Sequence, residues 1–332
     1  MTKYNNIAVF GCKSTTLFLL RALHGAGTRI RHLITIDSNV GVKNEVADYY
    51  DLTADAEQMG ITVYHARKYS LKDENDQSYI TGLGIDIAFV IGWQRLIPAD
   101  VLSGMKVGAF GMHGSAMNLP LGRGRSPMNW SIIEGRQVFY TNLFKYNHGV
   151  DEGDVVDTFK FQITGRDTGE TMHYKNLLAM KHLIIRNLSA LQSGTFALTR
   201  QPDDIQPTYY PKRSPDDSLI DWEKDLVSIE RFIRAVTRPF SGAFTFIGET
   251  RVTIWDAQLF DVQDFGYTDA PAATVVAVFP GGKFLVMCFG GLLLVNEYVS
   301  EALIREGMKF TNGGRILKQF ERNRHGFFDL EA

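Results

Sequence analysis

The stretch GAFGMHGSAMNLPLGRGRSPMNW, residues 108–130, decides how this chain is interpreted. Its first five residues are apolar or glycine, and they lead directly into a lone histidine, His113. A short apolar run that ends in glycine and polar residues is typical of a buried strand that is leaving a sheet. Ligands of doubly wound sheets bind beyond the carboxyl ends of the strands. His113 is therefore the first candidate for a functional side chain.

Further apolar runs precede this stretch and predict additional strands. They lie at residues 7–11, 30–37, 61–66 and 86–93. Two of them, IAVFG and DIAFVIGW, are apolar nearly throughout, as expected in a parallel sheet that is covered on both faces. Helix candidates separate the runs, for example STTLFLLRALHGAG, which starts with serine and ends in glycines. Residues 1–206 are thus expected to form an α/β domain with a doubly wound, Rossmann-like and mostly parallel sheet.

The pattern changes at QPDDIQPTYYPKRSPDD, which is rich in proline and aspartate and predicts a linker. One helix candidate follows, at residues 225–237. Strand candidates come next, at residues 243–248, 251–259, 273–279, 283–289 and 291–299. We predict a small C-terminal β-barrel or curled sheet of the OB kind over residues 207–305 and a tail over residues 306–332. Since the candidate motifs all precede the linker, residues 1–206 are expected to fold alone.

Composition limits the classes of protein that fit. Of the 332 residues, 45% are hydrophobic, which is enough for a sizeable core. The formal net charge of -2 gives no general attraction to phosphate backbones, so nucleic acid is disfavoured as a partner. Cys12 and Cys288 stand far apart in apolar runs, which indicates buried thiols and no disulfide framework.

No uninterrupted apolar stretch reaches 18 residues, and the N-terminus carries no basic segment followed by a long apolar core. We therefore expect a cytoplasmic protein without membrane attachment. No Cys or His cluster has metal-ligand spacing, so no metal is predicted. GCKST at residues 11–15 is similar to the end of a phosphate-binding loop, but Cys12 stands where that loop requires glycine. We interpret Gly11 as part of a tight strand-to-helix turn.

A second candidate, Asp151, lies in the segment HGVDEGDVVD between two further strand candidates. An aspartate in a glycine-flanked turn commonly caps the backbone of that turn. It could also approach His113 from a neighbouring strand. The residues alone leave both interpretations open.

Together these segments resemble the signature of folate-dependent formyltransferases. The usual form is Asn-x-His-x-Ser, then Leu-Leu-Pro, then Arg-Gly and a proline that opens a helix, which is similar to residues 108–130. GVDEGDVV resembles the Asp-x-Gly loop of the family, and GWQRLIPADVL its folate-side loop. YYPKRSPDDSLIDW and IRAVTRPFSGAFTF resemble the entry into the C-terminal barrel of the longer members. The four motifs occur in the family's order over roughly residues 5–300.

Within the family, RGRSPMNW and SPDDSLIDW are most similar to enzymes that formylate an amino sugar attached to a nucleotide, such as the formyltransferase part of the bifunctional aminoarabinose enzyme. This resemblance implies that 10-formyltetrahydrofolate is the formyl donor. Methionyl-tRNA formyltransferase is the alternative within the family. Between Lys212 and Arg305, 9 Lys and Arg stand against 13 Asp and Glu, a balance that disfavours a tRNA surface. The oligomeric state stays open, with a homodimer as one possibility.

The resemblance also implies roles for individual residues. His113 would stabilise the negative oxygen of a tetrahedral intermediate, and Asp151 would tune His113 and accept the excess proton. The residues expected to hold the folate are Arg95, Leu96, Ile97 and Val150. Those expected to contact the substrate are Ser115, Arg123, Arg125 and Trp130. The two arginines could instead anchor their loop, and Trp130 could pack a helix.

One position departs from the family pattern, because Gly111 stands where the pattern has asparagine. The loop after Ser115 is also two residues longer than in the pattern. Loss of one oxyanion donor typically costs about 10² to 10³ in rate. Asn118 in the enlarged loop could replace the missing amide, the enzyme could be weakly active, or the chain could bind its ligand without transforming it. If the amide is simply missing, Gly111→Asn is expected to raise turnover.

Overall fold

The computed structural model describes residues 3–147 and 149–328. The chain divides into two compact units, and each unit is assembled from three segments. The first unit contains Met1–Arg123, Tyr140–Phe161 and Lys175–Pro207. The second unit contains Gly124–Phe139, Gln162–Tyr174 and Thr208–Ala332.

The first unit is built on a seven-stranded sheet with the strand order β3-β2-β1-β4-β5-β7-β8. The strands are β1 (Ile7–Phe10), β2 (Ile30–Thr35), β3 (Thr62–His65), β4 (Ile87–Val90), β5 (Gly108–Ser115), β7 (Val138–Lys145) and β8 (Val155–Gln162). The first five are mutually parallel, and β7 runs antiparallel to β5. The prediction of a mostly parallel sheet is confirmed, and each of the five apolar runs forms a strand.

Helices cover both faces of this sheet. They are α1 (Ser14–Gly25), α2 (Ser38–Lys43), α3 (Thr53–Gln58), α4 (Glu74–Gly82), α5 (Ala99–Ser103) and α7 (Gly169–Ser193). Ile7 of β1 packs in one apolar cluster with Leu20 of α1 and Leu183 of α7. Its neighbour Ala8 faces the opposite side and packs in a second cluster with residues of α4 and α5. This alternation along β1 makes the domain doubly wound, as the sequence predicts.

The turn after β1 confirms the interpretation of the GCKST segment. A Cβ atom on Gly11 would lie 2.1 Å from the carbonyl oxygen of Ile91. The Thr16 hydroxyl donates to that same carbonyl at 2.7 Å. Gly11 is therefore required for close packing of the turn against the end of β4. Cys12 and Cys288 are buried free thiols, so the chain has no disulfide between them.

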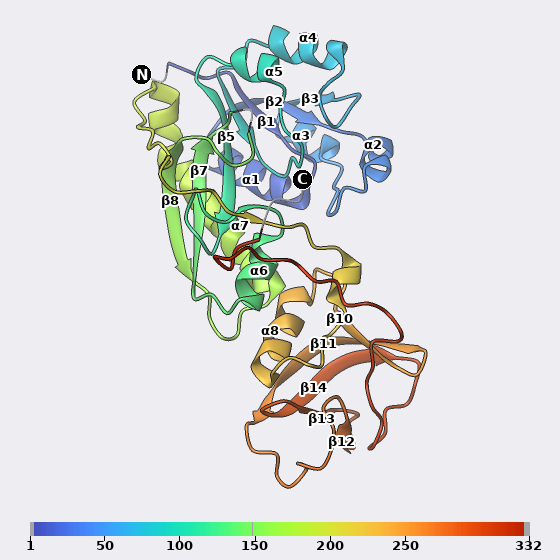
Figure 1. Ribbon diagram of the computed structural model, residues 1–332. Helices are drawn as coiled ribbons and strands as arrows, with labels where there is room; N and C mark the ends of the chain where they lie inside the picture. Colours follow the sequence, from blue (N-terminus) through green and yellow to red (C-terminus); the bar gives the residue numbers. More distant parts are fainter. Residues whose placement is uncertain (1–2, 148, 329–332) are drawn as a thin grey trace. The chain divides into compact units, whose positions relative to one another are not determined.

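The second unit contains the short helices α6 (Pro127–Ile133) and α8 (Leu226–Val236) and an antiparallel sheet of order β10-β11-β14-β13-β12. The strands are β10 (Ala243–Ile247), β11 (Thr250–Asp261), β12 (Val275–Val278), β13 (Phe284–Cys288) and β14 (Gly291–Ser300). Figure 1 shows α8 lying along this sheet, where it packs against β11. Each strand and the helix lie where the sequence predicts them. A two-residue strand, β9 (Tyr209–Tyr210), pairs with β6 (Arg123–Gly124).

A segment beyond the last strand joins the two edges of this sheet. The amide of Val275 in β12 donates to the carbonyl of Met308 at 2.8 Å. Phe246 in β10 and Thr311 exchange two backbone hydrogen bonds, of 3.0 and 2.9 Å. Residues 308–311 thus connect the edges and curl the sheet toward a barrel, as predicted. The expected boundary at residue 305 places this closing segment in the tail.

Candidate active site

The structure brings the two principal candidates together. His113 lies near the end of β5 and is only 7% exposed. Its Nδ1 atom is 3.2 Å from Oδ2 of Asp151, which lies in the turn between β7 and β8. The backbone of Asp151 has a φ of 52°, in the left-handed region that few non-glycine residues occupy. In this turn conformation the carboxylate of Asp151 is directed at His113.

The other ring nitrogen of His113 faces the loop that follows β5. Its Nε2 atom donates to the carbonyl oxygen of Gly122, at 2.7 Å. Since a carbonyl oxygen only accepts, Nε2 carries the hydrogen of this contact. Gly122 itself has a φ of 69°, and a Cβ atom there would lie 2.2 Å from Oγ of Ser115. Glycine at this position allows the loop to lie against His113.

Gln201 holds the Asp151 turn from outside the predicted motifs. Its Nε2 atom donates to the carbonyls of Asp151 and Gly153, both at 2.8 Å. Its Oε1 atom accepts from Nη2 of Arg123 at 2.7 Å, and both side chains are buried. Arg123 therefore supports the turn that carries the catalytic candidate. The sequence offered no signal for Gln201, because it stands in the proline-rich segment predicted to be a linker.

A cavity of about 410 Å³ adjoins this network. Its lining includes Arg123, Asn147, Glu152, Asp154, Arg200 and Gln201. Guanidinium groups bind phosphate well, and carboxylates can accept hydrogen bonds from an amine. The cavity therefore fits a polar, charged small molecule.

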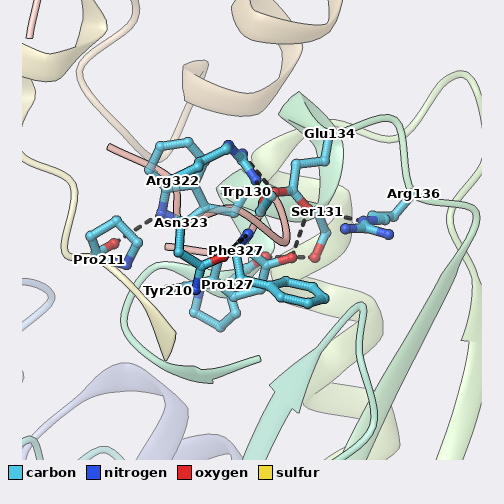
Figure 2. Close-up of polar contacts among 11 residues, drawn as sticks. Pro127, Trp130, Ser131, Glu134, Arg136, Tyr210, Pro211, Arg322, Asn323 and Phe327 are labelled. Atoms are coloured by element: carbon cyan, nitrogen blue, oxygen red, sulfur yellow. Dashed lines mark hydrogen bonds and ion pairs between the residues drawn. The ribbon is translucent and has the colours of Figure 1, made fainter. Parts of the chain in front are cut away.

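The other predicted substrate residues have structural contacts. Ser115 is buried at the end of β5, and its hydroxyl accepts from the amide of Met117 at 3.2 Å. Arg125 belongs to the second unit, where its side chain is exposed and its backbone amide donates to the carbonyl of Tyr210. Trp130, in the same unit, is 4% exposed. Its indole nitrogen donates to the carbonyl of Pro211 at 2.9 Å, and Figure 2 shows it inside a packed cluster. These contacts favour the packing interpretation of Trp130.

The four predicted folate residues lie in two loops of the first unit. Arg95 and Leu96 are exposed after β4, and the Arg95 guanidinium lies 5.0 Å from the Tyr69 ring centre. The side chain of Ile97 is buried in the core, so only its backbone is available to a ligand. Val150 is 43% exposed beside Asp151. Because β4 and β5 are parallel neighbours, the loop after β4 leaves the sheet at the edge where His113 lies.

Gly111 has no side-chain amide to donate, and Asn118 in the enlarged loop does not supply one in this structure. Asn118 is exposed, and its side chain makes no hydrogen bond within residues 3–147 and 149–328. The expected gain from Gly111→Asn is contradicted by the space around Gly111. A Cβ atom there would lie 2.0 Å from a ring carbon of Tyr146, so an asparagine side chain has no room. The sequence did not reveal this contact.

A further residue missed by the sequence lies directly across from His113. Asn142 of β7 is paired with His113 in the β5–β7 register and is 1% exposed. Its Oδ1 atom accepts from the Thr158 hydroxyl at 2.6 Å, whereas its buried amide nitrogen has no partner in the described part of the chain. Sheet pairing, which the sequence does not display, places it beside the site.

Within the described residues, no helix is long and apolar enough to span a membrane. The same residues contain no group of three or more His, Cys, Asp or Glu side chains placed to hold a metal ion.

The doubly wound sheet, the His–Asp pair at the end of β5 and the antiparallel C-terminal sheet define a two-part α/β protein with a candidate site at the carboxyl ends of its parallel strands. Residues 5–188 match the formyl transferase family, and residues 212–313 match the formyl transferase C-terminal domain. The chain belongs to the formyl transferase family.

Three proteins are among the solved structures with a similar fold. The N-formyltransferase from Helicobacter canadensis, in complex with folinic acid and dTDP-3-aminofucose, is 17% identical with a TM-score of 0.62, over 90% of this chain and 100% of that one. HypX from Aquifex aeolicus, in complex with tetrahydrofolic acid, is 15% identical with a TM-score of 0.60. The match covers 94% of this chain and 46% of HypX. Methionyl-tRNA formyltransferase from Clostridium thermocellum is 19% identical with a TM-score of 0.51. The match covers 76% of this chain and 93% of that one. At these identities the likeness shows the fold.

Proposed function

We propose that this chain is an N-formyltransferase that moves the formyl group of 10-formyltetrahydrofolate to the amine of a nucleotide-linked amino sugar. The observation that carries the proposal is the 3.2 Å contact between His113 and Asp151 beside a polar cavity. The N-formyltransferase from Helicobacter canadensis, which was solved with folinic acid and dTDP-3-aminofucose, supports this choice of donor and acceptor.

The site residues can serve each stage of this transfer. When the amine nitrogen bonds to the formyl carbon, the carbonyl electron pair moves to oxygen, and the Nε2–H of His113 would exchange the carbonyl of Gly122 for that oxygen. Asp151 can take the excess proton of the amine, directly or through water. The electron pair then returns to the carbon, the bond between the formyl carbon and N10 breaks, and N10 gains a proton. The products are the formamide and tetrahydrofolate.

We propose two binding regions around this centre. Arg123, on the cavity wall, would contact a phosphate of the nucleotide, and Glu152 and Asp154 would accept hydrogen bonds from the amino sugar. The backbone of residues 95–97 and the exposed side chains of Leu96 and Val150 would hold the pterin ring. Ser115 and Arg125 would be further substrate contacts, and Asn118 would supply an amide donor.

Two other functions stay candidates. A methionyl-tRNA formyltransferase has a similar fold, although the acidic balance of residues 212–305 disfavours tRNA. A descendant that binds folate without turnover is consistent with Gly111. Tetrahydrofolate release, measured with 10-formyltetrahydrofolate and either a panel of amino-sugar nucleotides or methionyl-tRNA, distinguishes the three. Release with a sugar nucleotide alone supports the proposal, and folate binding without turnover on any amine supports the descendant.

His113→Ala tests the catalytic centre directly. We expect its turnover to fall by about 10³-fold or more, because both the oxyanion donor and the link to Asp151 are lost. The matched control is His24→Ala, which alters an exposed histidine at the end of α1 and should keep full activity. Thermal unfolding of both variants should match that of the wild-type protein. A His113→Ala protein that unfolds early would instead indicate a histidine needed for core packing.

A further inference from the structure

On the face of β5 that carries His113, the ring of Tyr146 lies against Gly111. Residues 111 and 113 point to the same face, since side chains alternate along a strand. A Cβ atom on Gly111 would meet three ring carbons of Tyr146, at 2.0, 2.9 and 3.0 Å. The backbone of Gly111 is outside the left-handed region, so the ring, and not the chain conformation, excludes a side chain there. The phenol of Tyr146 thus occupies the space that a residue 111 side chain would fill.

Tyr146 is held firmly in this place. Its backbone amide donates to the carbonyl of Ala109 at 2.8 Å. Its ring stacks on Phe144, with centroids 5.2 Å apart and planes 17° from parallel. It also packs against the apolar cluster on this face of the sheet. The ring therefore presents its hydroxyl with little freedom to move.

The hydroxyl of Tyr146 is available to a ligand. It makes no hydrogen bond to any residue in the described ranges, and the side chain is partly exposed. Burial and, to a smaller extent, the negative charge of Asp151 raise the pKa of Tyr146. The phenol is therefore protonated at neutral pH. Its hydrogen bond to a nearby oxygen would become stronger as negative charge develops on that oxygen. The ring carbon that bears the hydroxyl, Cζ, lies 3.0 Å from the Cβ position of Gly111, on the face of β5 that carries His113.

We propose that the hydroxyl of Tyr146 donates a hydrogen bond to the formyl oxygen during transfer, and that Gly111 is present to make room for its ring. This inference rests on the proposed function. When the amine attacks, the carbonyl electron pair moves to oxygen, and the Tyr146 O–H would donate to that oxygen beside the Nε2–H of His113. The pair returns when the bond to N10 breaks. Tyr146 keeps its proton throughout, so it acts as a donor and not as an acid.

Tyr146→Phe removes the hydroxyl and keeps the ring. We expect kcat to fall by about 10² to 10³-fold, with the KM for the amine nearly unchanged, because the donor acts mainly in the transition state. Tyr79→Phe is the matched control, since Tyr79 is a half-exposed tyrosine of α4. An unchanged kcat in Tyr146→Phe overturns the proposal. A loss seen only in Asn142→Ala also overturns it, because the donor would then be Asn142.

A residue swap tests the steric relationship. Gly111→Asn alone should lose both activity and thermal stability, because its side chain meets the ring. Combining Gly111→Asn with Tyr146→Ala opens the space, and the new amide should restore at least part of the activity lost in Tyr146→Ala. A double variant that is no more active than Tyr146→Ala, while its folding by circular dichroism is intact, contradicts the exchange of donors.

An infrared experiment separates this inference from the proposed function. The probe is 10-formyl-5,8-dideazafolate with ¹³C at the formyl carbon, bound without amine. Tyr146→Phe should shift the formyl carbonyl band to higher frequency, because one hydrogen bond to its oxygen is lost, and Tyr79→Phe should not. If the wild-type protein binds the probe but formylates no amine, the proposed function fails and the band still decides the role of Tyr146. A wild-type protein that does not bind the probe overturns both.

Discussion

Glycines shape the site around His113 at the scale of single residues. Gly122 supplies the carbonyl that accepts from the imidazole, and Gly111 leaves space for the ring of Tyr146. Neither position tolerates a methyl group in the present packing, because a Cβ atom would lie 2.2 Å from Ser115 Oγ in one case and 2.0 Å from the ring in the other. These positions therefore shape the surroundings of His113 without contributing a side chain.

Gly122→Ala should impair turnover and stability together. The substitution combines a left-handed φ of 69° with the contact to Ser115, and it displaces the carbonyl from Nε2 of His113. Gly84→Ala is the matched control, because Gly84 has a φ of 61° and nothing within 4 Å of its Cβ position. Each should lose about 1 kcal/mol or more of unfolding free energy to backbone strain, measured by urea denaturation. Only Gly122→Ala should also lower kcat, and equal activities would show that the loop contact is dispensable.

At the scale of elements, one carboxylate joins distant segments of the second unit. Glu134, directly after α6, accepts from Arg322, Tyr210 and Arg136 at 2.8, 2.8 and 2.9 Å. Figure 2 shows these side chains around Glu134. Burial alone would raise the pKa of Glu134, but these hydrogen bonds outweigh it, and the pKa is lowered. Deprotonated Glu134 therefore stabilises the folded state. That contribution is present above the ordinary pKa of glutamate and is lost as the pH falls through the lowered folded value.

Glu134→Gln should accordingly destabilise the protein at neutral pH and less so in acid. We expect a loss of about 1 to 3 kcal/mol at pH 7, since charged hydrogen bonds to three partners are weakened. The difference from wild type should shrink as the pH falls below about 4.3, the ordinary value of glutamate. Urea unfolding across this pH range measures it. Glu249→Gln, at an exposed turn of the same unit, should show neither effect, and a pH-independent loss in Glu134→Gln would rule out the charge as the cause.

At the scale of the whole molecule, the two units do not follow the order of the sequence. The second unit takes residues 124–139 and 162–174 from the part of the chain expected to be the catalytic domain. In that unit α6 packs against α8, and Trp130 contacts the rings of Tyr210 and Phe328. A cut at residue 206 therefore divides one compact unit, although it follows the last catalytic motif.

Removal of residues 207–332 should expose the apolar side of α6 and cause aggregation. Trp130 and Ile132 are 4% and 2% exposed in the intact chain, and α6, which carries both, would lose its packing against α8. Size-exclusion chromatography of the 1–206 fragment should show aggregates. The same fragment with Trp130→Ser and Ile132→Ser should be more soluble, because the exposed apolar patch is smaller. A monomeric, fully folded unmodified fragment would restore the expectation drawn from the sequence alone.

The sequence alone determined where the five parallel strands, the five C-terminal strands and the helices α1 and α8 lie, and it identified the central pair. Apolar runs and turn residues specify local structure, so the strands at residues 7–10, 30–35 and 87–90 and the helix at 226–236 could be placed before folding. The motif resemblance selected His113 and Asp151, which lie 3.2 Å apart. Three features depend on the tertiary structure alone. They are the position of the Tyr146 ring against Gly111, the hydrogen bond from Gln201 to the Asp151 turn, and the pairing of residues 308–311 with the edges of the C-terminal sheet. These three depend on strand pairing and on backbone hydrogen bonds between distant segments, and such contacts have no periodic pattern in the sequence.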